Sequence, residues 1–211
     1  MCSSDLVQAV GDTLRVGRLH GRLGSGVVTR IDDAELTMDV ALEHDPPARL
    51  ALTLLLALPR PKALRRLLEY VAAVGLQRVV LLNTWRVEKS FWASPVLREA
   101  ALREQLLLGL EQGGDTVPPV VELRQRFKPF VEDELPTLSA GTCALAAHPA
   151  AAQPCPRAVD QPMTLAVGPE GGFTPYEVDL LCAHGFAAVS LGPRRLRVEH
   201  AVPALLGRLM V

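Results

Sequence analysis

Residues 165–191, LAVGPEGGFTPYEVDLLCAHGFAAVSL, place a glycine-rich turn and a helix between two short apolar runs. The start of the helix is clearly marked. Thr174 can cap it, Pro175 suits its first turn, and Glu177 completes a capping box. Gly185 stands where the helix should end. This strand–turn–helix–strand unit predicts an α/β fold on a parallel sheet, with the glycine-rich turn beyond the carboxyl end of a strand.

A second unit of the same kind lies earlier in the chain. The run ALTLLLAL at residues 51–58 is continuously apolar, as expected for a strand buried on both faces. Apolar residues then recur at helical spacing over residues 64–74, and Gly75 suits a helix end. LQRVVLL at residues 76–82 is another apolar strand. The two strands should therefore be parallel and joined by a right-handed crossover.

The remaining chain is divided by turn signals. Residues 11–40 alternate with short period, which predicts antiparallel β-structure, as a small barrel or a meander. Residues 44–48 then form a linker. Beyond the second unit we expect a loop over residues 83–94, helices at 95–112, 129–138 and 199–210, strands at 120–123 and 143–148, and a loop over 150–162.

Composition excludes several classes of protein. The 211 residues carry a formal net charge of −1 and are 49% hydrophobic, which fits one large domain or a domain with a small companion. No apolar run approaches the roughly 18–20 residues that a membrane span needs. The cysteines and histidines are scattered, which argues against a disulfide framework and a zinc site. We expect a soluble, cytoplasmic protein that binds no metal. The cysteines are Cys2, Cys143, Cys155 and Cys182.

Basic residues gather locally although the net charge gives no global support for nucleic-acid binding. Such patches can neutralise phosphates on a neutral protein. Ordinary solvated arginines are the alternative interpretation. The clusters are Arg15, Arg18, Arg22 and Arg30; Arg60, Lys62, Arg65 and Arg66; and Arg194, Arg195 and Arg197.

Two loops are candidates for chemistry. GPEGGF at residues 168–173 lets a ligand approach the backbone closely, but it matches neither GxGxxG nor a P-loop. The carboxylate of Glu170 would repel phosphate and could hold a polar or cationic ligand. LGPRRLRVEHA at residues 191–201 joins a strand end to a helix through a Gly-Pro turn and three arginines. Following successive strands, the loops can form opposite walls of one pocket; a structural turn and a solvated basic turn are the alternatives.

The combination of GPEGGF with SLGPRRLR-x-E-x-A at residues 190–201 closely resembles the signature of the RsmE family. Its members are bacterial enzymes of the SPOUT class that methylate N3 of a uridine in 16S ribosomal RNA. Residues 56–82, 85–92 and 102–115 are also similar to family segments. The resemblance implies an α/β SPOUT-type parallel sheet with a C-terminal trefoil knot in residues 47–211. Residues 1–46 would be a small β-rich PUA-like RNA-binding domain.

The resemblance also implies ligands and partners. The cofactor would be S-adenosyl-L-methionine, the substrate 16S rRNA in the small ribosomal subunit, and the assembly a homodimer with the pocket at its interface. The residues implied for the cofactor are Leu145, Ala146, His148, Gly168, Glu170, Gly171, Gly172, Leu191, Gly192, Leu196 and Arg197. The residues expected to contact RNA are Arg15, Arg18, Arg22, Arg194 and Arg195.

Methylation at uracil N3 requires loss of the N3 proton, so a base or a group that stabilises the anion is needed. Arg197 is the first choice to stabilise that charge or to grip a phosphate. Glu199 is a candidate base or a residue that orients Arg197. Its alternative role is a carboxylate favourable at a helix N-terminus. His200 can titrate, but a surface position suits it better.

The chain departs from the family in two places. Val198 and His200 stand where members generally have Thr, so neither position offers a hydroxyl. Members also usually have two to three dozen more residues before the equivalent of Val10, so the first strands of the RNA-binding barrel are expected to be missing. A SPOUT methyltransferase for another RNA position and a non-catalytic RNA-binding or assembly factor remain alternatives.

Overall fold

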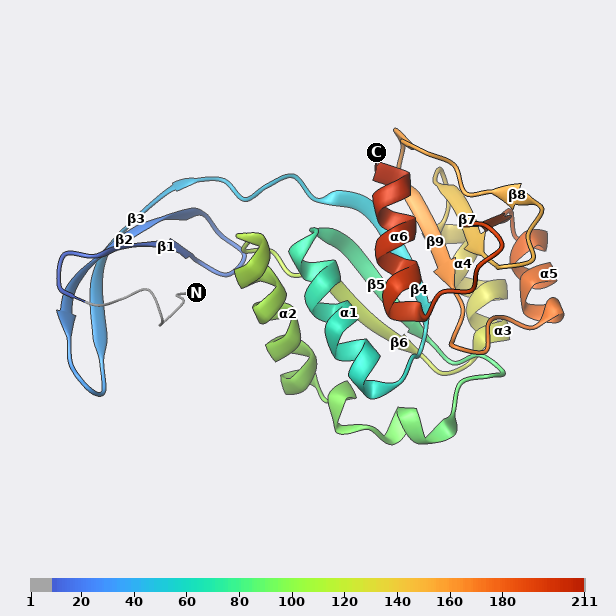
Figure 1. The fold of residues 1–211 in the computed structure, drawn as a ribbon, viewed down its shortest axis with the longest axis horizontal. Coiled ribbons are helices and arrows are strands. Elements are labelled where there is room, and N and C mark those ends of the chain that lie inside the picture. The colour runs from blue at the N-terminus through green and yellow to red at the C-terminus, as the bar shows by residue number, and fades with distance from the viewer. Residues whose placement is uncertain (1–8, 211) are drawn as a thin grey trace.

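Parallel pairing of β4 with β9 joins the two halves of the larger sheet in the computed structural model, which describes residues 9–210. That sheet has seven strands in the order β6-β5-β4-β9-β7-β10-β8, all of them parallel to their neighbours. A three-stranded antiparallel sheet, β1-β2-β3, extends from one end of it (Figure 1). The predicted α/β fold with a parallel sheet is confirmed.

The strands are β1 (Thr13–Gly17), β2 (Leu23–Ile31), β3 (Leu36–His44), β4 (Leu50–Ala57), β5 (Leu76–Leu82), β6 (Val120–Arg124), β7 (Cys143–Ala147), β8 (Gln153–Pro154), β9 (Met163–Val167) and β10 (Ala187–Ser190). The helices are α1 (Pro61–Ala73), α2 (Glu99–Gly113), α3 (Phe127–Pro129), α4 (Leu135–Leu138), α5 (Pro175–Ala183) and α6 (Val198–Met210). Short 3-10 turns occupy Lys89–Ala93 and Pro95–Leu97, and a π-helical turn at Phe130–Glu134 joins α3 to α4.

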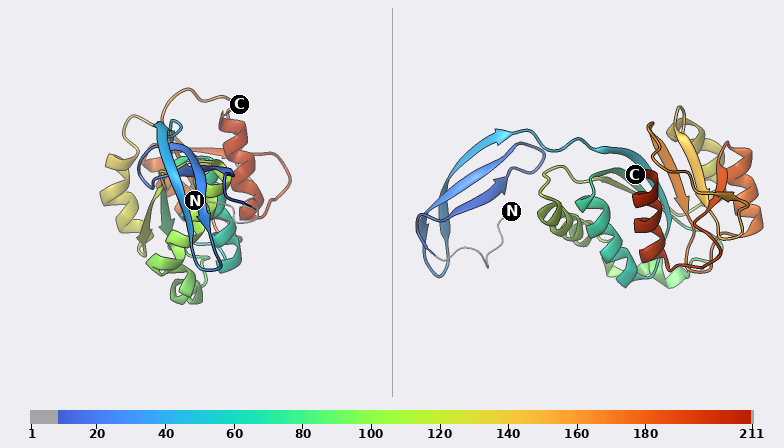
Figure 2. Two further views of the ribbon diagram at one scale, coloured as in Figure 1. Left: turned by 90° about the vertical axis from the view of Figure 1, so that its left-hand side faces the viewer. Right: turned by 45° about the horizontal axis from the view of Figure 1, so that its top comes forward.

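The core lies on both faces of the parallel sheet. Leu54 and Leu55 of β4 point to opposite faces and are both fully buried, as are Leu165 and Ala166 of β9. Figures 1 and 2 show α1, α2 and α6 on one face, and α5 with the short helices α3 and α4 on the other. Burial on both faces explains why these strands are continuously apolar.

Two expected helices and one expected loop differ from the structure. The helix predicted over residues 95–112 begins only at Glu99, because Arg98 has an extended backbone (φ −66°, ψ 139°) that separates it from the turn at Pro95–Leu97. The helix predicted near residues 129–138 is interrupted by the π-helical turn. The loop over residues 150–162 contains β8, which pairs with the end of β10.

The three-stranded sheet is a meander and contacts the larger unit through the turn between β1 and β2. The backbone N–H of His20 donates to the Thr116 carbonyl (2.8 Å), and the Thr116 hydroxyl donates to the Gly21 carbonyl (2.6 Å). The linker to β4 is also anchored. Arg49 donates to the carbonyls of Val117 (2.7 Å) and Pro118 (3.0 Å), and to those at the start of β5. These bonds connect the small sheet and the linker to the loop that follows α2.

No helix within residues 9–210 is long and apolar enough to cross a membrane.

Helices α1 and α2 approach closely because α2 carries glycine at the contact. A Cβ atom on Gly109 would lie 2.2 Å from the Glu69 carbonyl oxygen, and one on Gly113 would lie 2.4 Å from that of Ala73. In contrast, a Cβ on Gly207 of α6 would meet no atom within 4 Å among the described residues. Gly109 of α2 is therefore packed against neighbouring backbone, whereas Gly207 of α6 has open space around it.

We expect Gly109→Ala to destabilise the protein and Gly207→Ala to leave it unchanged or slightly more stable. Overpacking against α1 backbone costs about 1–3 kcal/mol, whereas alanine in an open helical site gains up to about 1 kcal/mol. Thermal denaturation should show Gly109→Ala melting lower by about 2–4 °C per kcal/mol. Equal melting temperatures for the two variants would contradict close packing at Gly109.

Candidate functional site

Five loops meet at one edge of the parallel sheet, because the carboxyl ends of parallel strands share an edge. Five consecutive strands of the sheet lead into these loops, in the order β5-β4-β9-β7-β10. Their following loops therefore lie along one rim. This rim carries both of the loops singled out in the sequence, residues 168–173 after β9 and residues 191–197 after β10.

A cleft of about 370 Å³ opens between these two loops. Residues 168–172 form one wall and residues 190–196 form the other. The end of β7 with the start of its following loop lines the cleft, and Val198, Ala201 and Leu205 of α6 line it as well. The volume lies within the range of roughly 300–1,000 Å³ typical of small-molecule sites. The predicted arrangement of two loops around one pocket is therefore present.

The walls of the cleft offer bare backbone and apolar surface. Gly172 (φ +72°) and Gly192 (φ +120°) adopt positive φ, and a Cβ on either would meet no described atom within 4 Å. A ligand can therefore approach the backbone closely at both positions, although each N–H already donates within its own loop, that of Gly172 to the Pro169 carbonyl (2.7 Å) and that of Gly192 to the Ser190 hydroxyl (3.0 Å). Leu191 and Leu196 are 37% and 48% exposed, although both are apolar. Such walls suit a flat, partly apolar ligand that lies close to the backbone.

Glu177 holds two of the rim loops together. Its carboxylate is buried and accepts three hydrogen bonds: from the N–H of Trp85 (2.8 Å), and from the N–H (2.7 Å) and hydroxyl (2.9 Å) of Thr174. The capping box predicted at Thr174 is confirmed. The same carboxylate therefore caps α5 and fixes the start of the loop that follows β5.

The glycine-rich loop is held from two further sides. Glu170 accepts a hydrogen bond from the backbone N–H of Arg60 (3.0 Å), and its carboxylate lies 4.0 Å from the Arg60 guanidinium. The guanidinium of Arg86 donates to the carbonyl of Gly171. The loop after β9 is thus connected to the loops after β4 and β5.

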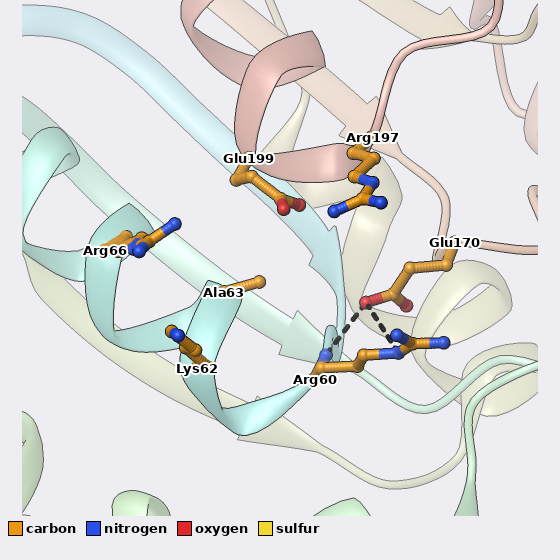
Figure 3. A pocket seen from close by; sticks show the side chains of 7 residues that line it. All are labelled: Arg60, Lys62, Ala63, Arg66, Glu170, Arg197 and Glu199. Atoms are coloured by element: carbon orange, nitrogen blue, oxygen red, sulfur yellow. Dashed lines mark hydrogen bonds and ion pairs between the residues drawn. The ribbon is translucent and has the colours of Figure 1, made fainter.

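A second cavity, of about 390 Å³, lies beside the cleft and shares Glu170 with it. In Figure 3, Glu170 reaches down to Arg60, while Arg197 and Glu199 extend toward each other above α1. The residues that line this cavity are Arg60, Lys62, Ala63, Arg66, Glu170, Arg197 and Glu199.

Most of the residues expected to bind the cofactor line the cleft. Leu145 and Ala146 are the exceptions, since they are buried in β7 and do not line the cleft. Arg197 and Glu199 line the second cavity rather than the cleft. Those that line the cleft are His148, Gly168, Glu170, Gly171, Gly172, Leu191, Gly192, Arg194, Arg195 and Leu196.

The other group of expected basic residues lies elsewhere. Arg15 is in β1 of the three-stranded sheet, and Arg18 and Arg22 are in the turn that follows. Arg22 forms an ion pair with Asp45 (3.0 Å). Figure 1 shows α1 and α2 between this sheet and the rim, so these arginines do not form one patch with Arg194 and Arg195.

Sequence reasoning missed Arg86 and Ser190 as cleft residues. Arg86 follows closely on the strand end of β5, which was the available signal. The hydroxyl of Ser190 accepts a hydrogen bond from the Gly192 N–H (3.0 Å) and so shapes the Gly-Pro turn. No sequence pattern marks that bond. Within residues 9–210 there is no group of three or more His, Cys, Asp or Glu side chains that could hold a metal ion.

Comparison with known proteins adds independent information. A family model described as an RNA methyltransferase domain matches residues 46–210. Ribosomal RNA small subunit methyltransferase E of Treponema pallidum is 28% identical over 206 residues, covering 93% of this chain and 76% of that protein. The protein of the same name from Mycobacterium bovis is 29% identical, covering 93% of this chain and 77% of its own length.

Solved structures share the fold. A Legionella pneumophila methyltransferase in complex with SAM has a TM-score of 0.73 at 24% identity, covering 96% of this chain and 84% of the other. Ribosomal RNA small subunit methyltransferase E of Neisseria gonorrhoeae, bound to S-adenosyl methionine, also has a TM-score of 0.73, at 20% identity. It covers 94% of this chain and 82% of its own.

We expect Glu177→Ala to destabilise the protein by about 1–3 kcal/mol, because it leaves the part-buried N–H groups of Trp85 and Thr174 without their acceptor. Chemical denaturation measures this loss directly. Asp179→Ala is the matched control, since Asp179 is exposed on the same helix and should change stability by less than about 0.5 kcal/mol. Equal stability of the two variants would remove Glu177 as the connection between the loops.

Proposed function

This chain belongs to the RNA methyltransferase domain family, and we propose that it transfers a methyl group from S-adenosyl-L-methionine to N3 of a uridine in the 16S rRNA of the small ribosomal subunit. The observation that carries the proposal is the cleft at the sheet rim, with its glycine-rich and leucine-rich walls and an adjoining cationic cavity. The names of the two relatives above support ribosomal RNA of the small subunit as the substrate.

The cleft residues suit S-adenosyl-L-methionine. The exposed side chains of Leu191 and Leu196 offer apolar faces to an adenine ring, and the absence of a side chain at Gly172 and Gly192 lets the ring lie close to the backbone. The glycine loop lacks the lysine of a phosphate cradle. When bound, the cofactor supplies a methyl group on a positively charged sulfur. His148, Gly168, Glu170 and Gly171 complete the proposed binding set.

The second cavity supplies the groups that act on the uracil. The guanidinium of Arg197 stabilises negative charge on the ring once the N3 proton has left. The carboxylate of Glu199 accepts that proton or orients Arg197, toward which it extends (Figure 3). Glu199 stands in the first turn of α6, where the helix dipole also favours its negative charge.

Three wider features of the proposal follow from the family resemblance. The C-terminal segment forms a trefoil knot, and the packing of α6 among the loops of the cleft is consistent with it. The three-stranded sheet belongs to a PUA-like RNA-binding domain of residues 1–46. The enzyme acts as a homodimer, with the cofactor pocket at the interface.

Methylation of small subunits from a strain that lacks the modification tests the proposal, with mass mapping of the modified nucleotide. We expect one methyl group on N3 of a single 16S uridine. Isothermal titration with S-adenosyl-L-methionine should show binding by the free protein. A protein that does not bind it, or that methylates another position, would contradict the proposal.

We expect Arg197→Ala to lower turnover by about a hundredfold or more, the usual effect of removing a group that stabilises developing charge. Cofactor affinity should change little, because Arg197 does not line the cleft. His200→Ala is the control, since His200 is exposed in the first turn of α6 and should retain turnover. Single-turnover kinetics separate the two effects, and unchanged turnover would exclude Arg197 from catalysis.

A further inference from the structure

We propose that the second cavity binds a backbone phosphate of the RNA strand next to the methylated nucleotide, through Lys62 and Arg66. The inference rests on the proposed function, because it takes RNA as the substrate. Neither residue belongs to the signature loops after β9 and β10.

The cavity carries an excess of positive charge. Four cationic side chains and two carboxylates line it. One carboxylate, Glu170, is already engaged with Arg60. Lys62, Arg66 and Arg197 form no ion pair with any of the residues that the structure describes. Their charges are therefore available to an anion.

The start of α1 is unfavourable without such an anion. Lys62 and Arg66 lie four residues apart on α1, so their side chains share one face, and like charges at this spacing repel. The first turn of α1 contains no acidic residue, although the N-terminus of a helix favours negative charge. A phosphate between the two side chains would reduce their mutual repulsion and would also place negative charge at the N-terminus of α1.

The position of the cavity favours a phosphate that belongs to the substrate. Glu170 lines both this cavity and the cleft proposed for the cofactor, and the two side chains proposed to act on the uracil, Arg197 and Glu199, line the cavity as well. A strand that presents its uracil to them therefore brings its neighbouring phosphates to this cavity. Glu170 and Glu199 repel a phosphate from the side of the glycine loop and α6. The anion is therefore expected on the α1 side, where Figure 3 shows Lys62 and Arg66.

The test measures binding of a uridine-containing 16S rRNA fragment as a function of salt. For Lys62→Ala/Arg66→Ala we expect affinity to fall by about tenfold to a hundredfold at low salt, as when a charge-assisted hydrogen bond is removed. The slope of log K against log salt should become shallower by about 0.7–0.9 for each phosphate that the protein no longer neutralises. Affinity for S-adenosyl-L-methionine should stay unchanged.

Arg65→Ala is the matched control. Arg65 is exposed on the same helix and does not line the cavity, so it should leave the affinity and the salt slope close to those of the unmodified protein. If the double variant behaves like Arg65→Ala, the phosphate site is wrong. Continued methyl transfer by the unmodified protein would still support the proposed function.

Competition by uridine monophosphate and by inorganic phosphate distinguishes an RNA phosphate from a small anion. Weak competition by both, with strong competition by unlabelled RNA, supports the proposal. If uridine monophosphate binds this cavity as tightly as RNA does, and Lys62→Ala/Arg66→Ala abolishes that binding, the assignment to the RNA strand is overturned.

Discussion

The pairing of β4 with β9 is the constraint on which the rest of the molecule depends. It joins residues far apart in the chain, from Leu52 opposite Met163 to Leu56 opposite Val167. Because the strands run parallel and are buried on both faces, their carboxyl ends must emerge together. That single requirement brings the loop after β4 beside the loop after β9, and with it the cationic start of α1 beside the glycine-rich turn.

Two carboxylates then fix what the strand pairing brings together. Glu170 joins the glycine-rich loop to Arg60, and Glu177 joins the start of α5 to the backbone of Trp85. Each carboxylate lies on one half of the sheet and accepts from a backbone N–H on the other half. These bonds define the shape of the rim, and a fixed shape is a requirement for a preorganised site.

Local signals explain what the sequence could predict. Continuous apolar runs, the capping box at Thr174 and the helix stop at Gly185 depend on neighbouring residues, and the structure agrees with each. The pairing of β8 depends on its contact with β10, which lies far along the chain, so it was missed. For the same reason the sequence grouped Arg197 with the cleft, although it faces a separate cavity with residues of α1. The sequence could not show that basic residues of the segments 60–66 and 194–197 line one cavity, because their meeting depends on the order of the strands in the sheet.

Arg49 anchors the linker between the small sheet and β4. Its guanidinium donates to the carbonyls of Gly75, Val117 and Pro118. Burial lowers the pKa of this guanidinium below its usual value, although the nearby Asp115 opposes the shift. Together with the bonds that join His20 and Gly21 to Thr116, Arg49 ties both the linker and the small sheet to the segment that follows α2. The small sheet and the rim consequently stand at a set separation, with α1 and α2 between them (Figure 1). Any ligand that touches both ends is therefore selected by its length and bend as well as by its chemistry.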